Sequence, residues 1–354
     1  MTSLSTNIVD IFLSSALPDL SWSTDAEDLH VRLYFQSPEQ TLIDTTLTAI
    51  NGTVSLYETR ELVERYMRHN GITRLYPLTV QHFENSSWHS VASMTVIFCE
   101  KTMVLPGSVS QFLEQHFLST RSAKTLPTDI NAVEQLYFIQ PEGTPPNPAL
   151  HVTYINDQGE VATGDIALAA DYNASLTNLF VCEFSVASIM AAVAAAASVI
   201  AVTVTVGNRH MEYYRPARRD HVAFKFRNAF NVFESAYLCA VVSRKTEDGR
   251  KIAHVAGGLA VYDRKPVTEY EVQTSPLSFE QASWIDQLIT SPDVRLLDDT
   301  PLIITDGEAV CHNDNGQMNS AKFSYKESDE RHSVSCLPQG ANVFTVPPHS
   351  YQFS

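Results

Sequence analysis

The residues best able to bind a metal ion gather near the C-terminal end of the chain. Their carboxylate, amide and imidazole groups are those that calcium and transition metals use, at Asp306, Glu308, His312, Asn313, Asp314 and Asn315. A calcium loop requires an acidic residue five positions before its glycine, but Cys311 occupies that position before Gly316, and no glutamate closes the loop. A hairpin turn at Asn315-Gly316 is therefore the favoured interpretation.

Other residues with chemical potential are dispersed. The twelve histidines form no HExxH or HxH motif, and the five cysteines form no CxxC pair. Gly257-Gly258 lacks the spacing of a phosphate-binding loop, so we interpret it as a bulge or a close contact within a strand. No G-x-S-x-G nucleophile elbow is present. The sequence thus predicts no catalytic residue, no metal site and no cofactor, and we do not expect an enzyme.

One basic cluster stands out in an acidic chain. Arg215, Arg218, Arg219, Lys225 and Arg227 lie close together, although the formal net charge of the 354 residues is −16. That acidity argues against nucleic acid or an anionic membrane as a partner, because both require an excess of basic groups at the contact. The cluster is either a solvated linker or a surface that pairs with acidic groups on another subunit.

The elements that must position these residues are mostly short strands. Alternation of apolar and polar residues predicts strands at 29–35, 76–83, 91–98, 150–155, 222–226, 236–242, 270–274, 301–305 and 321–325. Hairpin-type turns separate many of them, at Asn51-Gly52, 157–159, Asp248-Gly249 and Asn315-Gly316. This density of turns favours a mainly β fold with two or three antiparallel β-sandwich-like domains.

Three amphipathic helices are expected to flank the sheets, near 58–69, 108–118 and 278–290. Each is preceded by a pair typical of a capping box, namely Ser55 with Glu58, Ser108 with Gln111, and Ser278 with Gln281. Their apolar stripes should each pack on a sheet, and Phe279 is expected to face inward in the third helix.

A run without charged side chains, 184–206, is long enough to cross a bilayer. Its first half, 185–197, is mostly alanine and predicts a helix, whereas 199–206 alternates and predicts a strand. In that strand Ile200 and Val202 should share one face with Val204 and Val206. A helix followed by a strand and a turn at Gly207 is not a continuous span, so we predict no membrane span.

The chain length suits two or three domains. Polar, proline-containing segments suggest an N-terminal domain over 1–121, a middle domain with the Ala-rich helix over 122–215, a C-terminal domain over 216–340 and an extended C-terminal arm over 341–354. The scattered cysteines and the lack of a secretion signal at the N-terminus are typical of a protein made in a cytoplasm.

Three motifs in the last third of the chain carry a family resemblance. They are F-R-N-A-F-N-V-x-E at 226–234, Y-E-V-x-T-x-P-L at 270–277 and S-x-x-V at 291–294. Together with the segments around 57–71 and 112–127, they resemble an uncharacterised family encoded in the tail modules of phages and prophages of gut Bacteroidetes. The order strand, capped helix with an inward Trp284, and strand is also similar to tail-tube and distal-tail proteins, a likeness of fold alone.

This resemblance implies a structural subunit of a phage tail or baseplate, made in the host bacterial cytoplasm and present in repeated copies in the virion. Its partners would be copies of itself and neighbouring tail proteins. We expect the subunit interface at the basic cluster and at the extended end of the chain, where Pro347, Pro348 and Tyr351 stand, because a polyproline-like segment loses little entropy on docking.

Two other functions remain open. A receptor- or glycan-binding module of the tail tip would be supported by an exposed aromatic cluster on a sandwich face. Trp22 and Trp88 are candidates for it, although a core position is the favoured interpretation of each. A cell-wall hydrolase would need a pocket with convergent acidic residues.

Overall fold

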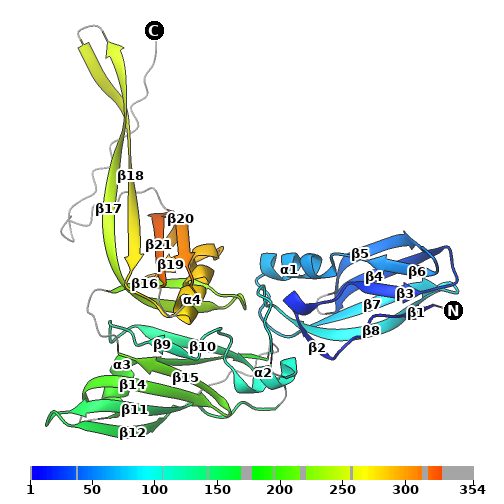
Figure 1. Ribbon diagram of the computed structural model, residues 1–354, viewed down its shortest axis with the longest axis horizontal. Coiled ribbons are helices and arrows are strands. Elements are labelled where there is room, and N and C mark those ends of the chain that lie inside the picture. Colours follow the sequence, from blue (N-terminus) through cyan, green and yellow to red (C-terminus); the bar gives the residue numbers. More distant parts are fainter. Residues whose placement is uncertain are drawn as a thin grey trace, which may run out of the picture.

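A computed structural model describes residues 2–36, 39–105, 107–141, 143–168, 178–193, 196–215, 221–255, 258–312 and 318–328. These residues are mainly β-structure, which confirms the predicted fold class. The strands form three units, each with its own apolar core, and a fourth apolar cluster lies where the units meet (Figure 1).

The N-terminal unit is a sandwich of two sheets. One sheet has the order β1 (Ser3–Leu4), β3 (Leu20–Ser23) and β6 (Thr53–Leu56). The other has the order β2 (Ile11–Leu13), β8 (Ser87–Ile97), β7 (Tyr76–Glu84), β4 (Asp28–Gln36) and β5 (Glu39–Thr48). A short 3-10 helix, η1 (Ser14–Ala16), follows β2. Trp22 of one sheet and Phe35 of the other belong to a single core.

Helix α1 (Thr59–His69) covers this core with Val63 and Met67. The predicted capping box at its start is wrong. Ser55 lies in β6, and Glu58 precedes the helix in a left-handed conformation with φ of 60°, without a side-chain cap. The chain turns into this helix through the backbone of Glu58, so the spacing of Ser55 and Glu58 was a coincidence.

The middle unit also has two sheets. The larger has the order β12 (Val161–Ala167), β11 (Ala149–Asn156), β14 (Ala196–Val206), β15 (Arg209–Tyr214) and β9 (Ala123–Thr125). The smaller pairs β10 (Val133–Ile139) with β13 (Leu179–Ser185). Side chains of both sheets and of α3 (Val186–Ala192) form one core.

The uncharged run divides into a helix and a strand, as predicted, with shifted boundaries. Helix α3 begins with a capping box between Ser185 and Ser188, and β14 already begins at Ala196. The register with β11 shifts between Ala201 and Val199, so that Val199 rather than Ile200 is buried. No helix in the described part of the chain is long and apolar enough to span a membrane.

The third unit is a closed barrel rather than a sandwich. Its strands have the order β16 (His221–Arg227), β17 (Phe233–Val255), β18 (Gly258–Thr274), β21 (Ser320–Glu327), β20 (Pro301–Val310) and β19 (Val294–Leu296). Helix α4 (Phe279–Thr290) has the predicted capping box of Ser278 and Gln281. Trp284 packs edge-on against Phe226, at 5.7 Å between ring centroids. Phe279, expected to face inward, is instead 52% exposed.

One turn prediction and one bulge prediction in this unit are wrong. Asp248 and Gly249 lie inside β17, paired with Pro266 and Lys265, and the strand continues to Val255. The chain reverses between Val255 and Gly258, so Gly258 marks the tip of a long hairpin instead of a bulge within a strand.

Helix α2 (Val109–Gln115) belongs to the junction of the three units. Its N-cap is the predicted Ser108, whose side chain accepts a hydrogen bond from the Gln111 amide. The apolar cluster around it takes residues from all three units, which are Leu13, Ile97, Cys99, Phe112, Leu113, Leu118, Ile139, Phe230 and Val232. This shared core fixes the units relative to one another.

Candidate assembly interface

The basic residues predicted to form a subunit interface are divided between two units. Arg215 follows β15 in the middle unit and donates a hydrogen bond to the Ser198 hydroxyl. Lys225 and Arg227 lie on β16 of the barrel. Arg218 and Arg219 lie outside the described residues, as do Pro347, Pro348 and Tyr351, so their part in an interface stays a prediction.

On the barrel, three basic side chains surround one aromatic ring. Lys225, Arg227 and Arg295 place their charged groups 5.2, 4.6 and 5.0 Å from the centre of the Phe233 ring. Arg295 comes from β19, far from the other two in sequence, and nothing in the spacing of the sequence indicated its place in this cluster. Such cation–π contacts hold long basic side chains in a fixed arrangement.

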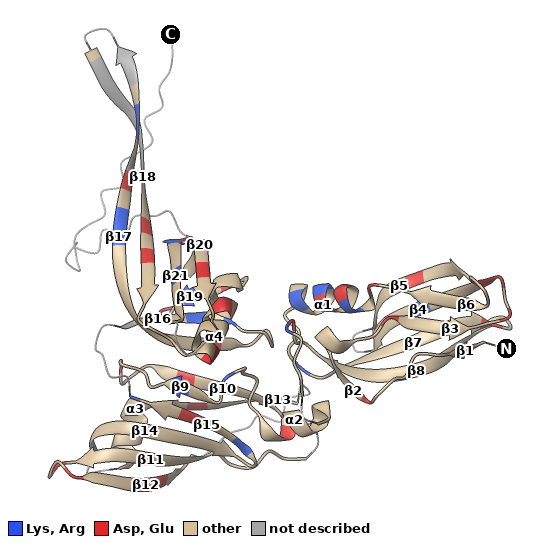
Figure 2. Cartoon of the chain, in the orientation of Figure 1, with Lys and Arg blue, Asp and Glu red and all other residues tan. Residues whose placement is uncertain are grey.

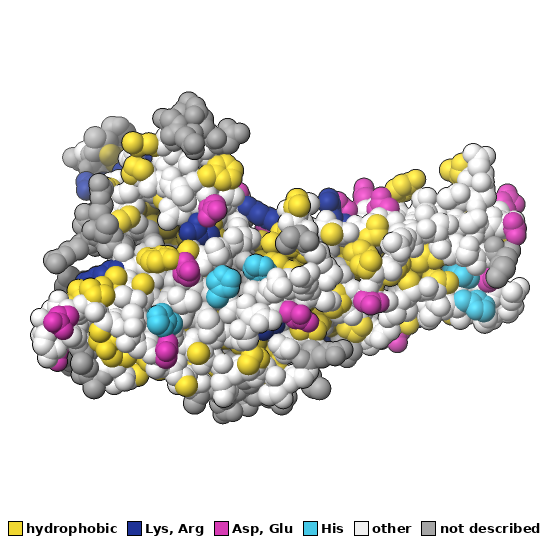
Figure 3. Space-filling model, turned by 60° about the horizontal axis from the view of Figure 1, so that its bottom comes forward, with side chains coloured by type: hydrophobic (Ala, Val, Ile, Leu, Met, Phe, Trp, Pro, Cys, Tyr) yellow, Lys and Arg dark blue, Asp and Glu magenta, His cyan; other side chains and the backbone are white. Residues whose placement is uncertain are grey.

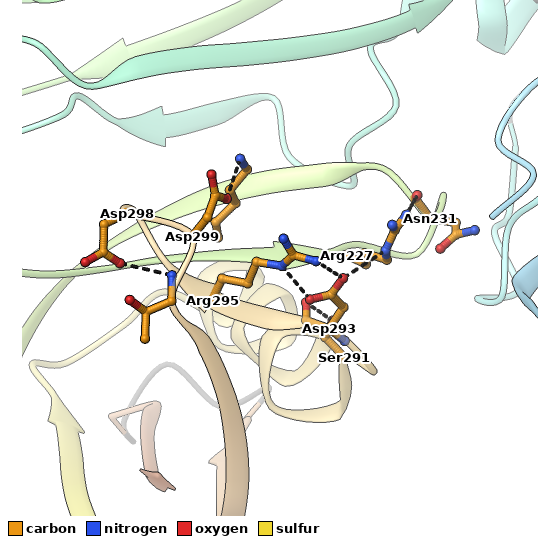
Figure 4. A network of polar contacts seen from close by, with 9 residues as sticks. Arg227, Asn231, Ser291, Asp293, Arg295, Asp298 and Asp299 are labelled. Atoms are coloured by element: carbon orange, nitrogen blue, oxygen red, sulfur yellow. Dashed lines mark hydrogen bonds and ion pairs between the residues drawn. The ribbon is translucent and has the colours of Figure 1, made fainter. Parts of the chain in front are cut away.

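Acidic side chains neutralise this cluster within the chain (Figure 4). Asp293 accepts two hydrogen bonds from Arg295, at 2.8 and 3.0 Å, and one from Arg227 at 3.3 Å. These contacts, first of all the hydrogen bond from Arg295, lower the pKa of Asp293 below its usual value. Lys225 pairs with Asp299 at 3.1 Å. The cluster therefore offers a neighbouring subunit much less positive charge than its sequence suggests.

The most prominent surface of the molecule is a two-stranded β-ribbon, formed by residues 245–255 of β17 and 258–269 of β18. It projects away from the barrel (Figure 1). At about 3.3 Å per residue, eleven residues of β17 reach about 35 Å beyond the barrel. Strand β16 pairs with β17 only as far as Cys239, and β21 pairs with β18 only from Tyr270 onward. Within the described residues, both outer edges of the ribbon thus lack a strand partner.

Several apolar side chains of the ribbon and of its base are exposed to solvent. Ile252 is 57% exposed and Val267 is 42% exposed, while Val241 at the base is 71% exposed. Charged groups of both signs lie along the lower part of the ribbon (Figure 2). A two-stranded ribbon is at best marginally stable alone in water, and free strand edges are the usual sites of pairing with another chain.

A second surface lies on the outer face of the five-stranded sheet in the N-terminal unit. His30, Phe83 and Trp88 stand directly opposite one another on β4, β7 and β8. Trp88 is 36% exposed and contacts both neighbours edge-on, at 5.4 Å from Phe83 and 5.0 Å from His30. Figure 3 shows exposed histidines at this end of the molecule. Trp22, the other candidate for an exposed aromatic, is buried in the core.

Beside His30, Phe83 and Trp88 on the same face lies a row of polar side chains, which hydrogen bonds hold in place. The Gln81 amide donates to Ser90 at 3.0 Å and to the Tyr34 hydroxyl at 3.3 Å. Arg32 lies over the Tyr34 ring and donates to Glu39 at 2.8 Å. This face therefore combines apolar rings with oriented donors and acceptors.

A buried charged group joins the middle unit to the barrel. Lys124 of β9 and Glu234 of β17 form an ion pair at 2.7 Å, with side chains only 4% and 3% exposed. Ser119 and Asn228 donate to the same carboxylate at 2.6 and 2.8 Å. Burial raises the pKa of Glu234, but Lys124 and these donors outweigh it and lower the pKa below its usual value.

A second carboxylate, Glu134 of β10, lies in the same region and is 1% exposed. The Tyr213 hydroxyl donates to it at 3.3 Å. Burial raises the pKa of Glu134 above its usual value, because the attraction of Lys124 offsets the loss of solvation only in part. No spacing in the sequence indicated this group, since Lys124, Glu134 and Glu234 come from three separated segments.

The residues weighed as a metal site, for which the sequence favoured a hairpin turn instead, are only partly described. Asp306 and Glu308 are exposed on β20, while Asn313, Asp314 and Asn315 lie outside the described residues. In the part of the chain that the structure describes, no three histidine, cysteine or acidic side chains gather closely enough to hold a metal ion.

No protein-family model matches the chain, and a comparison with curated proteins yields no match. We therefore infer function from the geometry of the chain and from the resemblance of its sequence motifs.

Proposed function

We propose that the protein is a structural subunit that assembles through its β-ribbon, and that it does so as a repeated component of a phage tail or baseplate. The main observation that supports this proposal is the ribbon of residues 245–255 and 258–269. Its two edges have no partner among the described strands. Pairing with an edge strand of a neighbouring copy would satisfy its backbone groups and cover Ile252 and Val267. The tail or baseplate is suggested by the sequence resemblance alone.

The remainder of the chain supports an assembly role. Three units share one apolar junction, which gives the ribbon a firm base from which to reach a neighbour. The ribbon is also anchored at its root, where Thr305 of β20 donates to Glu269 at 2.6 Å and Lys326 of β21 lies 3.7 Å from the same carboxylate. A long projecting element on a fixed base suits repeated, geometrically defined contacts.

Shortening the ribbon tests this function. Joining Lys245 to Glu269 through an Asn-Gly turn preserves the register of the barrel strands and removes the projecting part. We expect the shortened chain to unfold at nearly the same temperature as the full chain, but to remain monomeric by light scattering and to be excluded from particles.

A matched pair of point variants provides the control. Ile252→Asp places a charge on the ribbon, and Val161→Asp places the same charge on β12, where Val161 is 68% exposed. Only Ile252→Asp should impair assembly. Normal entry of the shortened chain into particles, or absence of the full chain from purified virions, would show that this function is wrong.

A second candidate function is supported by the row of His30, Phe83 and Trp88. Exposed rings beside oriented polar side chains suit the apolar faces and hydroxyl groups of a sugar, as a receptor- or glycan-binding module requires. Trp88 is by far the most exposed of the three tryptophans, since Trp22 is fully buried and Trp284 is 8% exposed.

Tryptophan fluorescence therefore reports on this face. Titration with a host surface polysaccharide should change the fluorescence saturably, and Trp88→Ala should abolish the change. Tyr57→Ala, which removes a 69% exposed ring elsewhere in the unit, should leave it intact. A response that persists in Trp88→Ala would exclude this face as the glycan site.

A further inference from the structure

A cavity lies at the seam between the middle unit and the barrel. Its volume is about 110 Å³, and it is bordered by β9, β17 and the start of α4. One water molecule occupies roughly 10–15 Å³ of such space, so the cavity has room for several waters or for one small organic molecule. Ligand sites occur preferentially at interfaces between domains, which makes the chemistry of these walls informative.

Two of the walls contain buried N–H groups without an acceptor. Nη1 of Arg121 and Nε1 of Trp284 have no hydrogen-bond partner among the described residues, and Trp284 is 92% buried, being 8% exposed. Guanidinium and indole N–H groups can only donate. Since buried donors are almost always paired in folded proteins, these two groups point to an acceptor that the described residues do not supply.

The charges around the cavity favour an anionic acceptor. Lys124, which also borders it, is committed to Glu234 at 2.7 Å. Arg121 has no ion pair within 4.0 Å in the described structure. Its guanidinium lies 5.8 Å from the centre of the Trp284 ring, and its Nε donates to the Ala123 carbonyl at 2.9 Å. Burial lowers the pKa of Arg121, and Glu280 and Glu234 oppose this effect only from a distance.

Uncharged side chains form the remaining walls of the cavity. The Gln281 side chain uses its carbonyl oxygen to accept from the Ser278 amide at 3.0 Å, which leaves its NH₂ group for another acceptor. Leu277 and Ile285 supply apolar surface. Arg121 and Gln281, which both border the cavity, are only partly buried and so are themselves in contact with solvent.

We propose that this cavity binds a small organic carboxylate, with the carboxylate oxygens accepting from Arg121 and Trp284 and the aliphatic part against Leu277 and Ile285. A carboxylate only accepts hydrogen bonds when ionised, and its planar pair of oxygens matches the fork of a guanidinium. Neither assembly through the ribbon nor glycan binding requires this site.

The test uses the full chain with sodium acetate and sodium succinate as probes, against sodium chloride at equal ionic strength. We expect each acid to raise the unfolding temperature saturably at tens of millimolar, and a crystal soaked with succinate to show density beside Arg121. Arg121→Gln should weaken binding by about ten-fold or more, because it removes a charge-assisted hydrogen bond. The control Arg60→Gln, on α1, should bind as the unmodified chain does.

Trp284→Phe keeps an aromatic ring but removes the indole N–H together with part of the buried ring, so its unfolding temperature is measured beside its binding to separate loss of binding from loss of folding. It should retain the fold and bind more weakly. A cavity that holds water only would give no saturable response to either acid, or equal responses in the unmodified chain and in Arg121→Gln, and either result would overturn the proposal.

Discussion

At the scale of single residues, the seam between the middle unit and the barrel depends on Lys124. Replacing it with methionine would leave Glu234 buried at 3% exposure without its counter-charge. Breaking a buried ion pair in this way costs about 3–5 kcal/mol. We therefore expect Lys124→Met to lose stability on that scale in urea unfolding at neutral pH. Lys225→Met, which breaks the solvent-accessible pair with Asp299, should lose no more than about 1 kcal/mol. Similar losses in both variants would contradict the prediction.

The neighbouring Glu134 should make stability depend on pH in a defined direction. Because burial raises its pKa, the folded chain keeps a proton that the unfolded chain releases once the pH exceeds the ordinary value of 4.5. The unfolded state then binds fewer protons, so stability falls as the pH rises from that value to the folded pKa. Glu134→Gln removes this titration. Its free energy of unfolding relative to the unmodified chain should therefore increase with pH across this window in urea titrations; a constant difference would disprove the assignment.

At the scale of elements, the contact between α4 and β20 depends on a glycine. A Cβ atom on Gly307 would lie 2.7 Å from Cγ2 of Ile289 and 3.1 Å from Cβ of Phe323. Gly307→Ala should therefore destabilise the barrel by about 1–3 kcal/mol, the usual cost of overpacking. Gly164→Ala on β12 is the matched control, because its nearest contact would be an ordinary 3.7 Å. Chemical unfolding of both variants checks this prediction, which fails if they are equally stable.

At the scale of the whole molecule, Arg209 connects separate elements of the junction. It is 2% exposed, and it donates to the Leu113 carbonyl in α2 and to the Ile139 carbonyl in β10, each at 2.8 Å. Arg209→Met leaves these buried carbonyls without that donor, so we expect a loss of about 3 kcal/mol or more. Calorimetry should resolve an additional transition as the units unfold less cooperatively. Arg60→Met, which alters an exposed arginine on α1, should retain the original profile; an unchanged profile in Arg209→Met would contradict the role of this junction.

The sequence by itself determined the features that depend on near neighbours. Alternation predicted most strands, the Ser278 and Gln281 pair predicted the start of α4, and the change of periodicity separated α3 from β14. Hydrogen bonds and side-chain periodicity at these places involve residues only a few positions apart. The sequence also drew attention to Lys225 and Arg227, although it did not indicate the acidic side chains that neutralise them.

Only the tertiary structure decided which distant segments meet. The sequence did not predict the ribbon. Its strands are exposed on both faces and carry charged residues such as those at 244–251, so they lack the alternation of apolar and polar residues that indicates a strand with one buried face. Glu58 does not form the expected capping box because the backbone turns into α1 at this residue. Ile200 is not buried as expected because the register between β14 and β11 shifts beside it. Lys124, Glu134 and Glu234 become one buried group, and Arg121 and Trp284 become walls of one cavity, through contacts between segments that are far apart in sequence. Burial and charge pairing of this kind are properties of the packed molecule, and no local pattern encodes them.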